Sequence, residues 1–310
     1  MNMLVAGVSG LVGSAFARAA KRRGHRVAGI VGHHTGAVDG VERQLAVDLA
    51  NAGAATTAIL EVFPEAIVNC AAISSPEACE ANPALAQALN AGLPALLARL
   101  AHHVSARFVH LSSEQVFDGA RTTPYAPGDP PSPINLYARQ KLESERAVAA
   151  AAPEFAVTLR VPLLMGNSLS GQRSPHERLF SDWAAGRTPR LFTDEFRQPC
   201  TAENLAEVML ELCERPDVRG VFHWAGAELV SRHALGVRIR EQFKLSELQA
   251  PLVAVTRAQI GDAARKRQAC LALTLAPLAA KLKTRPQTIA EQLEELAVPP
   301  PAREWYFKLA

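Results

Sequence analysis

The stretch "MLVAGVSGLVGSAFARAA", residues 3–20, contains the elements that decide the fold of this protein. Its first residues, "MLVAG", form a short apolar run that predicts a buried strand, and "LVGSAFARAAKRRG" (11–24) predicts a helix that ends at Gly24. Between them, Gly7, Gly10 and Gly13 make a G-x-x-G-x-x-G turn. Glycines in such a turn let a pyrophosphate approach the backbone, and the helix N-terminus offers free N–H groups. This position favours dinucleotide binding over a purely structural turn.

The rest of the first half alternates short apolar runs with longer amphipathic stretches. Four runs predict further buried strands: "RVAGIVG" (26–32), "AIVNCAA" (66–72), "RFVHLSS" (107–113) and "FAVTLRV" (155–161). Strands that alternate with helices indicate an α/β fold with a Rossmann-type, doubly wound parallel sheet. We expect this domain to span residues 1–162 and to be completed by a strand near 219–226. Residues 163–310 are then mostly a smaller C-terminal α/β lobe that binds the substrate.

The composition argues against several classes of protein. The formal charge of the 310 residues is only +3 and the basic clusters are short, so nothing indicates nucleic-acid binding. The five cysteines are odd in number and contain no C-x-x-C pair, which favours a reduced cytoplasmic protein over a disulfide framework or a zinc site. The histidines form no metal-binding motif. Because no run of about 18 uninterrupted apolar residues occurs, we expect no membrane span.

The end of the second predicted strand bears on the choice of cofactor. An acid there would hold the ribose 2′-hydroxyl of NAD and repel a 2′-phosphate. Here the sequence is "IVGHHTG" (30–36), which has no acid and favours NADP(H) over NAD(H). His33 or His34 could face the 2′-phosphate, or both could be exposed loop residues. Asp48, in "LAVDLA", could accept a hydrogen bond from the adenine or cap the next helix.

A tyrosine and a lysine stand four residues apart in "YARQK" (137–141). On a helix, Tyr137 and Lys141 would share one face, with Cβ atoms about 5–6 Å apart. The ordinary pKa of tyrosine is about 10, so proton transfer near neutral pH requires a pKa lower by roughly 3, and a neighbouring ammonium supplies part of that difference. The pair follows the glycine turn and the strand end "SSEQVF" (112–117) in that order, and this combination is specific although each motif alone is weak.

With these motifs, the chain resembles the extended short-chain dehydrogenase/reductase superfamily. The resemblance rests on "GVSGLVG" (7–13), "NCAA" (69–72), "SSEQVF", "YARQK" and "LRVPLLMG" (159–166). Within the superfamily it is most similar to the dTDP-4-dehydrorhamnose reductase group, through "SSEQVFDG" (112–119), "DEFRQPCTAENLA" (194–206) and "GVFHWAGAELVSRHALG" (220–236). The resemblance covers residues 1 to about 245 and fades beyond that point.

The resemblance implies an NADPH-dependent reductase of a keto group on a nucleotide-linked sugar, with a set of site residues. Ser113 and Tyr137 would polarise the ketone, Tyr137 would protonate the alkoxide as hydride arrives, and Lys141 would assist Tyr137. The other substrate-contacting residues would be Glu114, Gln115 and Arg197. The residues expected at the cofactor are Gly7, Ser9, Gly10, Leu11, Val12, Gly13, His33, His34, Asp48, Leu49, Cys70, Ala71, Ala72, Asn90, Tyr137, Lys141, Pro162 and Leu163.

Three relatives on the same scaffold are alternatives. Nucleotide-sugar dehydratases carry Thr-Asp-Glu where this chain has Ser113, Glu114 and Gln115, and an amide cannot act as a base, so the dehydratase is disfavoured. An NAD-dependent nucleotide-sugar epimerase remains open, and so does a non-catalytic regulatory subunit that binds NADP. A homodimer is possible.

The substrate itself stays undetermined at this stage. Arg173, Arg178 and Arg187 could each meet a sugar-nucleotide diphosphate or lie solvated on a helix. The segment "RKRQACLAL" (265–273) departs from the reductase pattern, which leaves the identity of the keto sugar open.

Overall fold

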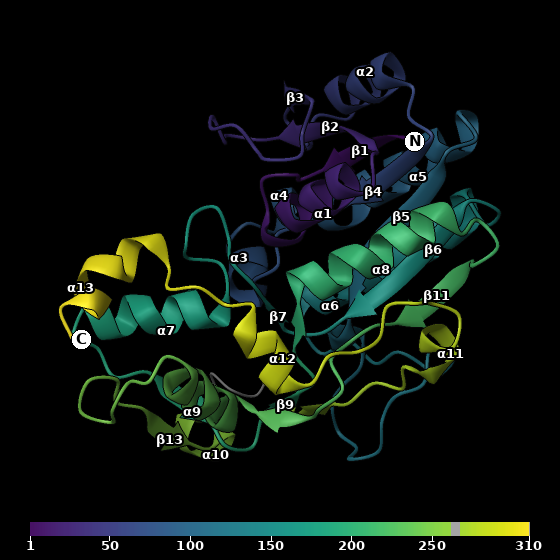
Figure 1. Ribbon diagram of the computed structural model, residues 1–310. Helices are drawn as coiled ribbons and strands as arrows, with labels where there is room; N and C mark the ends of the chain where they lie inside the picture. Colours follow the sequence, from purple (N-terminus) through teal and green to yellow (C-terminus); the bar gives the residue numbers. More distant parts are fainter. Residues whose placement is uncertain (262–266, 310) are drawn as a thin grey trace.

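The computed structural model describes residues 1–261 and 267–309 and contains a seven-stranded parallel sheet (Figure 1). In the order β11-β6-β5-β4-β1-β2-β3, its strands pair in parallel throughout. The bounds are β1 Asn2–Ala6, β2 Arg26–Val31, β3 Arg43–Ala46, β4 Ala66–Asn69, β5 Arg107–Ser113, β6 Ala156–Val161 and β11 Gly220–His223. The strand order reverses between β1 and β4, where doubly wound sheets open a crevice at the carboxyl ends of their strands. The predicted Rossmann-type α/β class is confirmed.

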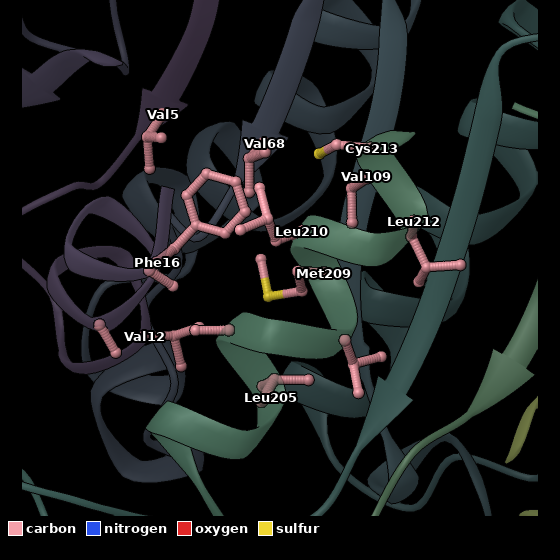
Figure 2. Packing of buried hydrophobic residues seen from close by; sticks show 14 of the residues in the cluster. Val5, Val12, Phe16, Val68, Val109, Leu205, Met209, Leu210, Leu212 and Cys213 are labelled. Carbon is pink, nitrogen blue, oxygen red and sulfur yellow. The ribbon is translucent and has the colours of Figure 1, made fainter. Parts of the chain in front are cut away.

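Helices cover both faces of this sheet. Helices α1 (Leu11–Arg22) and α8 (Ala202–Glu214) pack together over one face, where Phe16 and Met209 meet strand valines such as Val68 (Figure 2). Helices α2 (Ala52–Val62), α5 (Leu93–His103) and α6 (Leu136–Ala151) belong to the core of the other face. Side chains alternate along a strand, so each strand feeds both cores.

The helical stretch before β5 is assembled from several pieces. It comprises α3 (Pro76–Ala81), α4 (Pro83–Gln87), a π-helical turn η1 (Ala88–Gly92) and α5. By length and composition alone, Pro83–His103 could cross a membrane, but half of its most apolar window is buried. Leu93 and Leu97 pack into the core beneath the sheet, so this stretch is a core helix of the domain.

The chain after β6 builds a smaller unit from short elements, seen below the sheet in Figure 1. Strand β7 (Leu164–Met165) pairs with β10 (Cys200–Thr201), and β8 (Arg190–Phe192) with β13 (Val253–Val255). Strand β9 (Phe196–Arg197) lies between β12 (Val230–Ser231) and β14 (Cys270–Leu271). The remaining elements after β6 are α7 (Pro175–Ala184), α9 (Arg232–Gln242), α10 (Arg257–Ile260), α11 (Ala276–Ala279), α12 (Ile289–Glu294), η4 (Pro300–Ala302) and α13 (Arg303–Phe307). The short helical turn η2 (Glu114–Val116) lies earlier, directly after β5.

Two helices from the second half of the chain return to the large sheet together with β11. Helix α8 packs on α1, and α11 contacts β11 and places Leu278 in the same core. The sequence pattern predicted only the strand near 219–226 as a return element. The division of the chain at residue 162 into a cofactor domain and a substrate lobe therefore remains a prediction, with α8 and α11 on the sheet side of any such boundary.

The segment after residue 267 crosses back toward the end of β5. The Cys270 N–H donates to the carbonyl of Gly119 (3.1 Å), and the Tyr125 N–H donates to the carbonyl of Ala272 (2.8 Å). At Gly119, φ is +70°, and an added Cβ would lie only 2.6 Å from the Cβ of Gln268. This close packing holds Arg267 and Gln268 beside the strand end.

Candidate active site

A cavity of about 560 Å³ opens at the carboxyl ends of the central strands. One wall comes from the glycine turn, the loop after β4, the end of β5 and the residues after β6. The other wall comes from the smaller unit and carries Arg173, Arg178, Glu195, Arg197, Arg232, Arg267 and Gln268. The cavity therefore lies at the topological switch point, between the sheet and the smaller unit.

The predicted reactive residues meet on this cavity. Ser113 is the last residue of β5, and Tyr137 and Lys141 lie in the first turns of α6, which Asn135 caps by accepting from the Ala138 N–H at 2.8 Å. The Ser113 side chain lies beside the Tyr137 hydroxyl and favours its ionised form. The Lys141 ammonium donates to the carbonyl of Leu111. All three side chains are buried and are thus shielded from water.

Burial sets the proton affinities of this pair. It raises the pKa of Tyr137 to about 12, against the effect of the Ser113 side chain. It lowers the pKa of Lys141 to about 8, against the negative charge of Glu145. Proton transfer near neutral pH was expected to need a lower tyrosine pKa, but the Tyr137 pKa is raised because desolvation outweighs the neighbouring groups. The Tyr137 hydroxyl is therefore protonated at neutral pH and not a phenolate.

The glycine turn has the geometry of a phosphate cradle. Gly7 has φ +77°, and a Cβ there would lie 2.9 Å from the backbone of Ala71. At Gly13, a Cβ would lie 2.4 Å from the carbonyl oxygen of Gly7. Gly10 is the N-cap of α1 and brings no side-chain cap, so the first-turn N–H groups of this helix stay available to an anion. These residues fit a dinucleotide pyrophosphate.

The predicted cofactor residues divide into two groups in the structure. Those on the cavity wall are Gly10, Leu11, Val12, Cys70, Ala71, Ala72, Tyr137, Lys141, Pro162 and Leu163. Those outside the wall are Gly7, Ser9, Gly13, His33, His34, Asp48, Leu49 and Asn90. His33 and Asp48 are exposed near the ends of β2 and β3, and the Asp48 carboxylate accepts from the Ala50 N–H at 2.9 Å.

Asn90 lies within the π-helical turn and is fully buried. Its side-chain amide accepts from the Ile73 N–H (2.9 Å) and donates to the Ile73 carbonyl (3.1 Å) and to Gln140 (3.1 Å). These bonds fasten the loop that lines the cavity to α6. In this structure Asn90 thus acts on the cavity wall through Ile73.

The predicted substrate residues Glu114 and Arg197 pair with each other. Glu114 Oε1 lies 3.1 Å from Arg197 Nε, and both side chains are almost fully buried. The second carboxylate oxygen, Oε2, has no hydrogen-bond partner in the described part of the chain. Burial raises the pKa of Glu114 to about 8 and outweighs the positive charge of Arg197. Gln115 also lines the cavity, and its side-chain oxygen accepts from Asn135 at 3.3 Å.

A cluster of guanidinium groups on the cavity was only partly visible in the sequence. Glu195 binds Arg267 at 2.8 Å and Arg197 at 3.3 Å, and it faces Arg232 at 4.0 Å. Arg173 and Arg178 line the cavity as well, whereas Arg187 is exposed and pairs with Asp182 at 2.7 Å.

Sequence reasoning missed three of these residues, Glu195, Arg232 and Arg267. They come from separate parts of the chain, and the one available signal was the departure of "RKRQACLAL" from the reductase pattern. Arg267 is part of that segment, while its first two residues, 265 and 266, lie outside the described residues.

A doubly wound sheet with a glycine turn and a Ser/Tyr/Lys set at the carboxyl end of its strands defines the extended short-chain dehydrogenase/reductase class. The chain matches the family model "RmlD substrate binding domain" over residues 1–298 and belongs to that family. The predicted resemblance is thereby confirmed.

Named relatives fall into two functional groups. "Probable low-salt glycan biosynthesis reductase Agl14" of Haloferax volcanii is 34% identical over 78% of this chain and 80% of its own length. "Methionine adenosyltransferase 2 subunit beta" of Xenopus laevis is 31% identical over 78% of this chain and 72% of its own length. The relatives thus include an oxidoreductase and a subunit of a different enzyme.

Solved structures show the same architecture. A hypothetical dTDP-4-dehydrorhamnose reductase from Sulfolobus tokodaii has a TM-score of 0.80 at 26% identity and covers 96% of this chain and 100% of its own. The dTDP-4-dehydrorhamnose reductase of Bacillus anthracis in complex with NADP has a TM-score of 0.81 at 18% identity, over 94% of this chain and 97% of its own.

Proposed function

We propose that this protein is an NADPH-dependent reductase of a keto group on a nucleotide-linked sugar, with Tyr137 as the proton donor and Ser113 and Lys141 assisting. The observation that carries the proposal is that Ser113, Tyr137 and Lys141 line one cavity, which the glycine turn also borders. The reductases among the relatives support the same reaction class.

The residues of the cavity divide the work of such a reduction. NADPH supplies the hydride when bound, and Gly10, Ala71 and Pro162 are among the residues that would hold it. The hydroxyl groups of Ser113 and Tyr137 donate hydrogen bonds to the substrate ketone and stabilise the charge that develops on its oxygen. The raised pKa of Tyr137 keeps its proton in place until the far more basic alkoxide takes it.

Two features favour NADP over NAD as the cofactor. No acid follows β2, where the chain continues with Gly32, His33 and His34. The Bacillus anthracis reductase that shares the fold is solved in complex with NADP. His33 and His34 remain the candidates for the 2′-phosphate.

The opposite wall of the cavity supports a nucleotide-sugar substrate. Arg178, Arg232 and Arg267 offer guanidinium groups, which suit the geometry of phosphate oxygens. The Oε2 of Glu114, which has no partner among the described residues, can form a hydrogen bond with a sugar hydroxyl. Gln115 cannot titrate and so does not supply the base that a dehydratase needs.

A second candidate function is that of a non-catalytic, NADP-binding subunit of another enzyme. It is favoured by the 31% identity to a methionine adenosyltransferase subunit. The NAD-dependent epimerase is the weaker alternative because no acid follows β2. A cytoplasmic location, which the five free cysteines support, and a homodimer stay predictions.

The deciding experiment measures cofactor binding and turnover with purified protein. NADPH is expected to bind more tightly than NADH by fluorescence titration, and to be oxidised with at least one member of a panel of 4-keto sugar nucleotides. Tyr137→Phe is expected to lose about 100-fold or more in turnover and to keep its NADPH affinity, because it removes the phenolic hydroxyl and leaves the ring in place. Tyr306→Phe, whose hydroxyl donates to the Phe243 carbonyl in the smaller unit, serves as the matched control.

Each other outcome overturns a defined part of the proposal. Full turnover by Tyr137→Phe would exclude the mechanism, and binding of NADH alone would exclude the cofactor. NADPH binding without turnover, together with a stoichiometric protein partner, would establish the second candidate.

A further inference from the structure

A buried ion pair lies beside the predicted reactive residues without including any of them. Glu145 on α6 and Arg160 on β6 form it, and each side chain is only 5% exposed. Arg160 donates through Nε to Oε1 (2.9 Å) and through Nη2 to Oε2 (2.8 Å), so the pair is bidentate. The Ser112 hydroxyl donates to the same Oε1. The carboxylate of Glu145 thus binds two adjacent strands of the sheet.

The pair connects the elements that carry the reactive set. Ser112 immediately precedes Ser113 at the end of β5, and Glu145 follows Lys141 by one helical turn on α6. Arg160 is itself held by the Pro127 carbonyl (3.1 Å) and lies over the ring of Phe117 at 5.0 Å. The contacts therefore fix the helix that presents Tyr137 and Lys141 against the strand that presents Ser113.

Stability alone does not account for such a pair. Two buried charges cost desolvation, and an apolar pair of similar volume is often as stable or more stable. The better attested role of a buried polar contact is to fix the arrangement of the elements that it joins. Here those elements are β5, α6 and β6.

The charge of Glu145 also acts on Lys141. The two residues stand four apart on α6 and so share one face. Glu145 is the strongest of the charged groups that hold the lysine pKa up, against the burial that lowers it to about 8. The other titratable groups facing Lys141 are Cys70 after β4, Cys79 on α3 and His110 on β5.

We propose that Glu145 and Arg160 are positioning residues for the Ser113–Tyr137–Lys141 set. Arg160 holds the Glu145 carboxylate in place through two hydrogen bonds. This carboxylate in turn joins α6 to β5 through Ser112, and its negative charge favours the protonated form of Lys141. The inference rests on the proposed function only for the reaction that the set performs, since the contacts and the titration of Lys141 are properties of the chain itself.

The test follows the titration of Lys141 by NMR in the full chain labelled with ¹³C at the lysine Cε. The Lys141 signal is assigned from the spectrum of Lys141→Arg. The variants are Glu145→Gln, Arg160→Met and the double variant with both changes. The control is Glu61→Gln, which breaks the exposed pair with Arg43 at 3.2 Å and is expected to leave the Lys141 midpoint unchanged.

The two single variants are expected to differ in sign. Glu145→Gln removes the negative charge and leaves Arg160, so the Lys141 midpoint should fall by about one pH unit or more. Arg160→Met leaves the carboxylate unbalanced, so the midpoint should stay or rise. A purely structural role predicts the same disturbance from both changes, and equal shifts in one direction would overturn the proposal.

The double variant keeps the test decisive if a single variant does not fold. It contains no unpaired buried charge, which is the change that destabilises such sites most. Because Glu145 is the partner that acts on Lys141, the midpoint should still fall in the double variant. If the Lys141 midpoint in the double variant equals that of the wild type while Tyr137→Phe still loses turnover, this inference is wrong and the proposed function stands. If the midpoint falls while Tyr137→Phe keeps full turnover, the proposed function is wrong and this inference stands.

Discussion

Glu114 stands next to Ser113 in the chain, yet its chemistry is set by residues from the other wall of the cavity. The sequence suggested a substrate contact for Glu114 and for Arg197 separately. In the structure the two side chains bind each other, and burial keeps the Glu114 carboxyl group protonated up to about pH 8, the value to which its pKa is raised. One of its oxygens stays unpartnered among the described residues. Neighbours in space, and not in sequence, decide what this residue can do.

The raised pKa of Glu114 predicts a pH-dependent stability difference. Between pH 4.5, the ordinary pKa of a glutamate, and pH 8, the Glu114 carboxyl group is ionised in the unfolded chain but still protonated in the folded chain. The stability that the protonated group contributes is therefore complete below about pH 4.5 and is lost as pH rises toward 8, by up to about 1.4 kcal/mol per pH unit. Glu114→Gln cannot titrate, so its free energy of unfolding relative to that of the wild type should increase as the pH rises from about 4.5 to 8. Urea unfolding at pH 5.5 and pH 8 checks this, and a difference independent of pH would contradict it.

At the scale of elements, the tight turn between β1 and α1 can form because its glycines have no Cβ. Gly7 and Gly13 lie where a Cβ would meet backbone atoms at less than 3 Å. The glycine spacing predicted this turn correctly because its geometry is local. The π-helical turn around Asn90 was not predicted, since one extra residue in a helix leaves no clear periodic signal.

Gly13→Ala is expected to disrupt the turn. The new methyl group would lie 2.4 Å from the Gly7 oxygen, so the turn must shift, at a cost of about 1–3 kcal/mol in stability and about 10-fold or more in NADPH affinity. Gly53→Ala is the matched control, because its Cβ would lie at an ordinary 3.4 Å from Asn51 on helix α2. Thermal unfolding and NADPH titration measure both variants, and equal behaviour of the two would rule out the steric argument.

At the scale of the whole molecule, the cavity needs both walls. The sheet supplies the glycine turn and the reactive set, while the guanidinium groups come from α7, β9, α9 and the segment after residue 267. Arg267 reaches Glu195 and also lies 3.7 Å from Glu77 of α3 across the cavity. The smaller unit thus adds positive charge to a site whose other wall carries the glycine turn and Ser113, Tyr137 and Lys141.

Arg267→Met is expected to affect nucleotide binding at one wall of the cavity without affecting NADPH binding at the other. It should weaken the binding of UDP or dTDP, used as probes of the nucleotide part, by about 10-fold or more, because a charged hydrogen-bond donor is lost. NADPH affinity should not change, since the glycine turn belongs to the other wall. Arg187→Met is the control, as Arg187 is exposed and pairs with Asp182. Calorimetric titration of both variants checks this, and equal losses for UDP and NADPH would argue against separate walls.

The sequence by itself determined the parts of this protein whose signals are local. The glycine turn, the buried strands, the tyrosine–lysine spacing and the family all follow from patterns a few residues long. Only the tertiary structure decided the rest: the strands of two or three residues, the Glu114–Arg197 and Glu145–Arg160 pairs, and the arginine wall with Arg267. The direction of the Tyr137 pKa belongs to the same group. Each of these depends on burial and on contacts between distant segments, which the packing of the folded chain sets and no local pattern contains.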